Sequence, residues 1–293
     1  MSDRSQNLIG VIGVGLLGNA LSHRLRQAGH SIIGYDVQAE QLECLIQIGG
    51  QAANSIAEVV EVAPVIFLSL PDSTISKTVC IEIARLAPSS STVIDTTTGS
   101  PEDAIENSLM LAQSSIQYLD ATVAGASSQV QQGEGVFMVG GDPMVFQQFS
   151  SLLENISNVV FHLGEVGMGA RVKLIVNLVI GLNRAVLAES LALANATGIP
   201  METALEVLKA TPAYSSVMDL KGTKMIEQDF TPQARLRQHR KDVQLICQLA
   251  TEHLQELPLS NLHAQLLDTA IEAGYGDLDN SAIYKVIRDN LSS

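Results

Sequence analysis

A short glycine motif between an apolar run and a helical pattern constrains the fold of this chain most strongly. The pattern GxGxxG follows directly after the run LIGVIG at 8–13, and residues 15–30 have helical apolar spacing. In such a strand–turn–helix unit the glycines let a pyrophosphate approach the backbone, and the helix N-terminus faces the anion. The alternative is a tight turn packed on a helix. The residues predicted to bind a dinucleotide here are Gly13, Gly15, Leu16, Leu17 and Gly18.

An acidic residue follows at the end of the second predicted strand. Asp36 ends the run SIIGYD at 31–36. A carboxylate at this place hydrogen-bonds the adenosine ribose and repels a 2′-phosphate. Val37 and Gln38 supply no arginine that could hold such a phosphate. We therefore expect NAD as the preferred cofactor, with NADP possible. A helix N-cap is the alternative role for Asp36, and the two roles are compatible.

Strand and helix patterns alternate over the first 165 residues, which predicts a doubly wound, mainly parallel sheet. After Gly169 the pattern becomes helical to the end, starting with one long helix over 170–195. The expected fold is therefore an α/β Rossmann domain (1–165) joined by a long interdomain helix to an all-α domain (166–293) for substrate binding and oligomerisation. Further strands are expected at 64–70, 91–97, 117–123, 135–141 and 158–164, and further helices at 38–49, 73–87, 201–210, 213–227, 232–256, 260–274 and 279–291.

Composition narrows the classes of partner. The formal net charge of −14 predicts an acidic surface, which repels nucleic-acid phosphates and anionic membranes. The polar N-terminus shows no signal peptide, and the apolar run at 172–182 is too short to span a bilayer. We therefore expect a cytoplasmic protein without a nucleic-acid or membrane partner. The three cysteines have no metal-ligand spacing and the six histidines do not cluster, so no metal site is expected.

A lysine stands near the start of that apolar run. Lys173 is followed by Asn177 four residues later, and nearly every other position of the run is apolar. An ammonium costs several kcal/mol when it is fully buried and unpaired. Residues four apart share one face of a helix, so Asn177 can hydrogen-bond the ammonium or a ligand beside it. A snorkelling lysine with its head in solvent is the alternative.

Six segments, in this order and at this total length, resemble the β-hydroxyacid dehydrogenase family, the group of 3-hydroxyisobutyrate dehydrogenase. The resemblance covers nearly the whole chain. The similar segments are IGVIGVGLLGNALSHRLRQAGHSIIGYD (9–36), LSLPDS (68–73), DTTTGSP (95–101), DATVAGASSQVQQGEGVFMVGG (120–141), GMGARVKLIVN (167–177) and FTPQARLRQHRKDVQL (230–245).

The resemblance implies that Lys173 is the catalytic acid/base, assisted by Asn177. Oxidising an alcohol removes a proton from the hydroxyl, and a group poised near neutral pH must take it. Desolvation by apolar neighbours would lower the pKa of a lysine toward that range.

The resemblance also implies roles for residues at the strand ends and in the late helical segment. Thr98 would contact the substrate or the nicotinamide ribose, Leu70 and Pro71 the adenosine or ribose, and Lys241 the cofactor or substrate. The alternatives are a strand-end turn for Thr98, strand-end packing for Leu70 and Pro71, and a solvated helix face for Lys241. Arg235, Arg237, His239 and Arg240 either line the cleft or form part of that solvated face.

The chain departs from the family pattern in the substrate segment. Ala124 stands where the family has a serine, and Ala126 replaces its second glycine. Backbone N–H groups around Gly125 and Ala126, with Ser127 or Ser128, would then hold the substrate. The residues expected to bind substrate are Thr98, Ala124, Gly125, Ala126, Lys173 and Asn177.

The sequence leaves three functions open. The leading hypothesis is an NAD(P)-dependent oxidoreductase that acts on a small 3-hydroxy acid or a related alcohol. The second is an NADPH-dependent aldehyde reductase for glyoxylate or succinic semialdehyde. The third is a non-catalytic nucleotide-binding or scaffold protein. For the two enzymes the partner is a small hydroxy acid or aldehyde. The apolar interdomain helix predicts a homodimer or homotetramer.

Overall fold

The computed structural model describes residues 7–289 and divides after Lys173 into two compact units. We call these unit 1, which ends at Lys173, and unit 2, which begins at Leu174. The polar N-terminal segment and the last two residues of the helix predicted over 279–291 lie outside the described residues.

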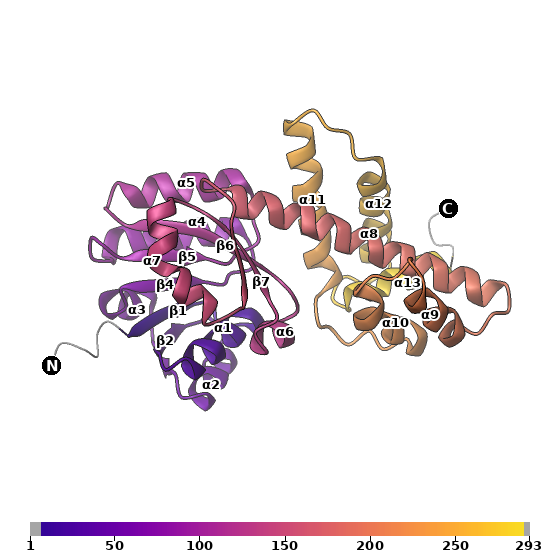
Figure 1. Ribbon diagram of the computed structural model, residues 1–293, viewed down its shortest axis with the longest axis horizontal. Coiled ribbons are helices and arrows are strands. Elements are labelled where there is room, and N and C mark those ends of the chain that lie inside the picture. Colours follow the sequence, from indigo (N-terminus) through magenta and orange to yellow (C-terminus); the bar gives the residue numbers. More distant parts are fainter. Residues whose placement is uncertain (1–6, 290–293) are drawn as a thin grey trace. The chain divides into compact units, whose positions relative to one another are not determined.

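Unit 1 is built on an eight-stranded sheet in the order β3-β2-β1-β4-β5-β6-β7-β8 (Figure 1). The first six strands are parallel, β7 is antiparallel to β6, and β8 is parallel to β7. This confirms the predicted doubly wound, mainly parallel sheet; the two-residue strand β3 is too short to leave a sequence pattern. The strands are β1 (Leu8–Ile12), β2 (Ser31–Tyr35), β3 (Gln51–Ala52), β4 (Val65–Leu68), β5 (Thr92–Asp95), β6 (Gln117–Ala124), β7 (Val136–Gly140) and β8 (Val159–His162).

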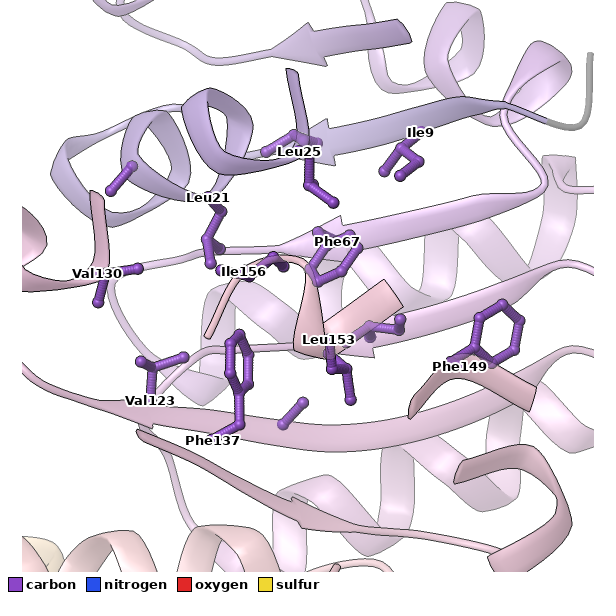
Figure 2. Packing of buried hydrophobic residues seen from close by; sticks show 14 of the residues in the cluster. Ile9, Leu21, Leu25, Phe67, Val123, Val130, Phe137, Phe149, Leu153 and Ile156 are labelled. Atoms are coloured by element: carbon purple, nitrogen blue, oxygen red, sulfur yellow. The ribbon is translucent and has the colours of Figure 1, made fainter. Parts of the chain in front are cut away.

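Helices cover both faces of this sheet, so both faces are apolar. Strand β4 shows the alternation: Phe67 lies in the core under α1, α6 and α7, whereas Ile66 and Leu68 lie in the core under α3, α4 and α5. Figure 2 shows the first of these cores, where Phe67 lies among side chains from the facing helices such as Leu21 and Leu153. The helices are α1 (Leu16–Gln27), α2 (Ala39–Gln47), α3 (Ile56–Val62), α4 (Ser73–Leu86), α5 (Pro101–Ala112), α6 (Ser127–Gln131) and α7 (Pro143–Glu154).

Four of these helices, α3, α5, α6 and α7, were not predicted from the apolar pattern. Two of them carry clear start signals in the sequence. The hydroxyl of Ser100 accepts the N–H groups of Glu102 and Asp103 at the start of α5, and proline follows the cap. Asp142 caps α7 in the same way, again with proline at the first helical position.

Unit 2 is entirely helical over its described residues, as predicted. Its core gathers Leu187 and Leu191 of α8, Met225 of α10, Val243 of α11 and Tyr284 of α13. The long helix predicted over 170–195 is α8, with 29 residues, whose first residues belong to unit 1. The helices are α8 (Met168–Ala196), α9 (Met201–Ala210), α10 (Val217–Glu227), α11 (Leu236–Glu252), α12 (Pro258–Glu272), a 3₁₀ turn η1 (Asn280–Ala282) and α13 (Ile283–Arg288).

Helix α8 is long and apolar enough to meet a length-and-hydropathy test for a membrane span. The apolar run at 172–182, too short by itself to span a bilayer, is only part of this 29-residue helix. The core helix of a globular protein meets the same test, and Leu187, Ala188 and Leu191 of α8 are buried in the core of unit 2. The helix also carries Arg184, which is 5% exposed.

A buried ion pair ties the end of the chain to the middle of unit 2. Lys221 Nζ lies 2.9 and 3.0 Å from the two carboxylate oxygens of Asp279. The same carboxylate accepts the N–H groups of Gln233 and Ala234 and both donors of Ser281. Burial acts to raise the pKa of Asp279, but these donors hold it below its usual value.

We expect Asp279→Asn to lower the free energy of unfolding by about 3–5 kcal/mol, because it leaves the Lys221 ammonium buried without a counter-charge. Urea denaturation followed by circular dichroism measures this loss. The control is Asp277→Asn, which breaks the exposed pair with Arg237 at 2.7 Å and should change stability far less. Equal effects of the two substitutions would contradict the assignment.

Candidate active site

The glycine motif forms a tight turn between β1 and α1, and two of its glycines are required by packing. Gly13 has φ +89°, and a Cβ atom there would lie 2.2 Å from the carbonyl oxygen of Ser69. A Cβ atom at Gly18 would lie 2.0 Å from the carbonyl oxygen of Gly13. Neither position has room for a side chain, so the turn is fixed by contacts within unit 1.

Gly15 differs from its two neighbours because a Cβ atom there would meet nothing within 4 Å. It is the N-cap of α1, and no side chain caps the helix at this point. The first N–H groups of a helix carry partial positive charge and seek acceptors. Open space in front of such a helix end suits the pyrophosphate of a dinucleotide, so the residues present fit this ligand. Leu16 is mostly exposed beside the opening, and Leu17 packs against the core.

Asp36 holds the glycine turn from the end of β2. Its Oδ2 accepts the N–H of Val14 at 2.7 Å, and its Oδ1 accepts the N–H of Gln38 at 2.9 Å. The carboxylate therefore holds the turn just ahead of α2, but it is not the N-cap that the sequence offered as the alternative, because the N-cap is Gln38 and no side chain caps this helix. Each carboxylate oxygen has two lone pairs, so it can still accept a ribose hydroxyl.

The predicted residues after β4 and β5 lie at the same sheet edge, because parallel strands end together. Leu70 packs close to Gly13, with its Cδ2 atom 3.1 Å from where a Gly13 Cβ would be. Its N–H donates to Thr97 Oγ1 at 3.2 Å. Pro71 is exposed and Thr98 is half-buried.

A buried carboxylate supports this edge from inside the sheet. Asp95 accepts hydrogen bonds from Ser76, Tyr118 and the N–H of Thr97. Burial raises the pKa of Asp95 above its usual value, although these donors act in the opposite direction. Because Thr97 in turn binds Leu70, Asp95 fixes the path of the chain just before Thr98.

Lys173 reaches the same edge from α8. The residue is 9% exposed, and its Nζ donates to the carbonyl oxygen of Val123 at 2.7 Å. Val123 is followed by the predicted substrate segment, Ala124, Gly125 and Ala126. The N–H of Ala126 donates to Gln129 Oε1 at 2.9 Å, so it is already engaged within the segment. The ammonium and the end of β6 thus lie in contact within unit 1.

Asp120, which the sequence analysis did not assign, anchors the start of α8. Its Oδ1 accepts the N–H of Gly167 at 2.9 Å, and its Oδ2 accepts the N–H of Ala170 at 2.8 Å. Thr122 Oγ1 donates to the carbonyl oxygen of Gly169. Burial raises the pKa of Asp120 to about 6, against the effect of the two N–H donors. Asp120 opens the segment DATVAGA, but nothing in the sequence marks this contact, because its two donors lie 47 and 50 residues further along the chain.

The other two predicted residues belong to unit 2. Asn177 Nδ2 donates to Asp242 Oδ2 at 3.1 Å, and Lys241 Nζ lies 3.4 Å from Asp242 Oδ1. Asp242 therefore orients the Asn177 amide and connects α11 to α8 within unit 2.

The basic cluster on α11 consists largely of paired or buried side chains. Arg237 donates to Asp277, Arg240 makes a two-pronged contact with Asp268, and His239 is buried. Over residues 7–289, no group of three or more His, Cys, Asp or Glu side chains is arranged to hold a metal ion.

Family models match both parts of the chain. The model described as the NAD binding domain of 6-phosphogluconate dehydrogenase matches residues 8–164. The model described as NAD-binding of NADP-dependent 3-hydroxyisobutyrate dehydrogenase matches residues 167–287. Most of the site residues in unit 1 therefore lie within a recognised NAD-binding module.

Individual relatives agree with these models. A 2-(hydroxymethyl)glutarate dehydrogenase of Eubacterium barkeri is 28% identical over 95% of this chain and 94% of its own length. The cytokine-like nuclear factor N-PAC of Anopheles gambiae is 28% identical over 96% of this chain, which spans only 50% of that protein. The crystal structure of 3-hydroxyisobutyrate dehydrogenase from Salmonella typhimurium superposes with a TM-score of 0.90 at 27% identity, covering 95% of this chain and 99% of that one.

The three glycines of the turn predict two different outcomes for the same substitution. Gly18→Ala should lower the free energy of unfolding by about 1–3 kcal/mol, because the new Cβ meets the Gly13 carbonyl oxygen. Gly15→Ala should lower the free energy of unfolding by less than about 1 kcal/mol, because alanine is a poorer N-cap residue than glycine. The same substitution should weaken NADH binding by about tenfold. Thermal unfolding and a fluorescence titration with NADH measure the two effects. A stable Gly18→Ala protein would refute the packing argument.

Proposed function

Since this chain belongs to the β-hydroxyacid dehydrogenase family of NAD(P)-dependent oxidoreductases, we propose that it oxidises a small 3-hydroxy acid, or a related alcohol, with Lys173 as general acid/base. In this proposal residues 1–165 bind the dinucleotide, and residues 166–293 supply the substrate and oligomerisation functions. The bound nicotinamide would supply the chemistry of hydride acceptance or donation.

The contact between Lys173 Nζ and the Val123 carbonyl oxygen carries this proposal. It holds a buried ammonium at the edge of the sheet where β1, β2, β4 and β5 also end. A carbonyl acceptor orients the ammonium, and a group that exchanges a proton with a substrate must be held in a defined position.

The proposed proton transfer uses this chain's own residues. Neutral Lys173 Nζ would take the proton of the substrate hydroxyl during oxidation, and the ammonium would return it during reduction. The Asn177 amide, oriented by Asp242, would donate or accept a hydrogen bond one helical turn further along α8.

The substrate segment favours a second candidate beside the hydroxy acid. Ala124 supplies no hydroxyl for a carboxylate, and the N–H of Ala126 is engaged by Gln129. Losing a hydrogen bond to a charged group typically costs about 1.5–3 kcal/mol. A small aldehyde without a carboxylate, reduced by the same Lys173, avoids this cost and is therefore the alternative substrate class, whereas glyoxylate and succinic semialdehyde carry a carboxylate and do not avoid it.

We also propose that the chain forms a homo-oligomer through α8. Four apolar side chains at near-heptad spacing stay at least half exposed on this helix: Ile175, Val179, Val186 and Leu193. An exposed apolar stripe of this kind is stabilised when another apolar surface packs against it. The same helix of a second copy of the chain has a surface of matching chemistry and length.

The proposed preference for NAD rests on Asp36 and predicts the effect of removing its charge. Wild type should bind NADH more tightly than NADPH, because the carboxylate repels a 2′-phosphate. Asp36→Asn keeps a side-chain oxygen that can accept the Val14 N–H but removes the negative charge. The affinities for NADH and NADPH should therefore become more similar. Isothermal titration with both cofactors measures the ratio. Tighter binding of NADPH by wild type would overturn the preference.

The role of Lys173 is tested by its replacement with alanine. Lys173→Ala should retain NADH binding and lose turnover by about 100-fold or more, the usual contribution of a positioned acid or base. A panel of hydroxy acids and aldehydes supplies the substrates for this assay. Lys77→Ala is the control, since it removes an exposed lysine of unit 1 that pairs with Glu106. If wild type binds the cofactor but converts no member of the panel, the non-catalytic function gains support.

A further inference from the structure

The first turn of α8 lacks the side chains with which many helices satisfy their own first N–H groups. Gly167 is the N-cap residue, because its carbonyl oxygen accepts the N–H of Arg171 at 2.9 Å. Ala170 is the third residue of the helix. In a capping box the side chains at these two positions each accept the N–H of the other residue, but glycine and alanine carry no acceptor. The start of α8 therefore needs acceptors from another segment of the chain.

Asp120 of β6 supplies both of these acceptors. The N–H of Gly167 donates to its Oδ1 at 2.9 Å, and the N–H of Ala170 donates to its Oδ2 at 2.8 Å. These are the two N–H groups that the side chains of a capping box would bind. One carboxylate from a strand 47 residues earlier in the chain thus takes the place of both capping side chains.

Close packing defines the position of the helix start on the strand. A Cβ atom at Gly169 would lie 2.8 Å from Asp120 Oδ2, and one at Gly140 of β7 would collide with Asp120 Oδ1. The side chain of Thr122 lies on the same face of β6 as that of Asp120, and its Oγ1 donates to the carbonyl oxygen of Gly169 at 3.1 Å. Asp120 and Thr122 are 2% and 1% exposed. Three buried hydrogen bonds and two glycines therefore fix the first turn of α8 against β6.

Lys173 follows this turn so closely that its position depends on it. It lies three residues after Ala170, which is about 4.5 Å further along the helix axis, and residues three apart lie on the same side of a helix. Its Nζ donates to the carbonyl oxygen of Val123, three residues after Asp120 on the same strand. A shift of the helix start along β6 would therefore change the distance that the lysine side chain must span.

Charge strengthens the contact of Asp120 with the helix start. A carboxylate at this place faces the positive end of the helix macrodipole. Burial raises the pKa of Asp120 to about 6, against the effect of the two N–H donors, so the group is ionised above neutral pH. The ion pair of Arg171 with Glu102 beside the same turn is partly exposed and 3.7 Å long, and such pairs contribute little. Asp120 therefore restrains this turn more strongly than the ion pair does.

We propose that Asp120 is a positioning residue for Lys173, holding the first turn of α8 on β6 so that the ammonium stays at the Val123 carbonyl oxygen. This inference rests on the proposed function, in which Lys173 exchanges a proton with the substrate. Asp120 is buried and holds two backbone N–H groups, so it acts through Lys173. Misplacing a reacting group by about 1 Å can lower a rate by about 100-fold, so loss of the restraint should appear in kcat.

The kinetic test replaces Asp120 with asparagine, which keeps the volume but leaves one acceptor for two N–H donors. With the substrate found in the panel of hydroxy acids and aldehydes, Asp120→Asn should lower kcat by about 10- to 100-fold. The dissociation constant of NADH should change by less than about twofold, because Asp120 is not part of the glycine turn. Thr122→Val, which removes one hydrogen bond to the same turn, should give a smaller fall in kcat.

Two control variants separate positioning from stability. Asp142→Asn alters a carboxylate that likewise accepts two N–H groups at a helix start, that of α7, and should leave kcat unchanged. Leu153→Ala opens a cavity in the core under α7, so it should lower the midpoint of thermal unfolding but not kcat well below that midpoint. The proposal is overturned if kcat is unchanged in Asp120→Asn, if NADH affinity falls as much as kcat, or if Leu153→Ala loses as much kcat.

Crystal structures of wild type and Asp120→Asn supply a readout that does not require turnover. We expect the variant to lose the contact between Lys173 Nζ and the Val123 carbonyl oxygen while β6 and β7 stay in place. If wild type converts no substrate, the proposed function fails and this contact alone decides: its loss in the variant supports positioning, and its retention overturns it. If Asp120→Asn does not fold, Thr122→Val takes its place in both measurements.

Discussion

The paired hydrogen bonds from Gly167 and Ala170 to Asp120 are the interaction on which the site depends most. They fasten the first turn of α8 to the middle of β6, and Thr122 adds a bond to Gly169. With the helix start fixed on this strand, Lys173 lies one and a half turns later and reaches Val123 of the same strand. One strand therefore sets both the origin of the helix and the position of the ammonium.

This arrangement explains why the sequence before Lys173 is rich in glycine. Gly167 has φ +94°, which L side chains rarely adopt. A Cβ atom at Gly169 would lie 2.5 Å from the carbonyl oxygen of Met138 and 2.7 Å from that of Asp120. The helix can approach the sheet this closely only because both positions lack a side chain. The glycines serve the packing of α8 as well as any ligand.

The sequence predicted the fold where apolar periodicity was strong, and it missed four helices of unit 1, of which only α3 and α6 are short. The parallel strands, α8 and the helical character of unit 2 followed from such patterns. Helices α5 and α7 were missed although Ser100–Pro101 and Asp142–Pro143 announce them. The glycine turn and Lys173 were likewise visible in the sequence. The support that Asp95 and Asp120 give to the site was not visible in the sequence. A buried carboxylate is recognised by the groups that donate to it, and most of these donors lie far away in the chain.

The buried cations of the two units show why partners must be known before a charge can be interpreted. Lys221 faces both oxygens of Asp279 and is a structural cation. Lys173 donates to the carbonyl oxygen of Val123, which fixes the position of its ammonium at the end of β6. Arg184 of unit 2 has two buried donors, Nε and Nη1, without a hydrogen-bond partner in the part of the chain that the structure describes. The sequence does not distinguish these environments, since Lys173 and Arg184 share one helix and Lys221 lies beside a second lysine, Lys224, in another. Their different environments arise from tertiary contacts, since the partners of Lys173 and Lys221 come from segments that are distant in the chain.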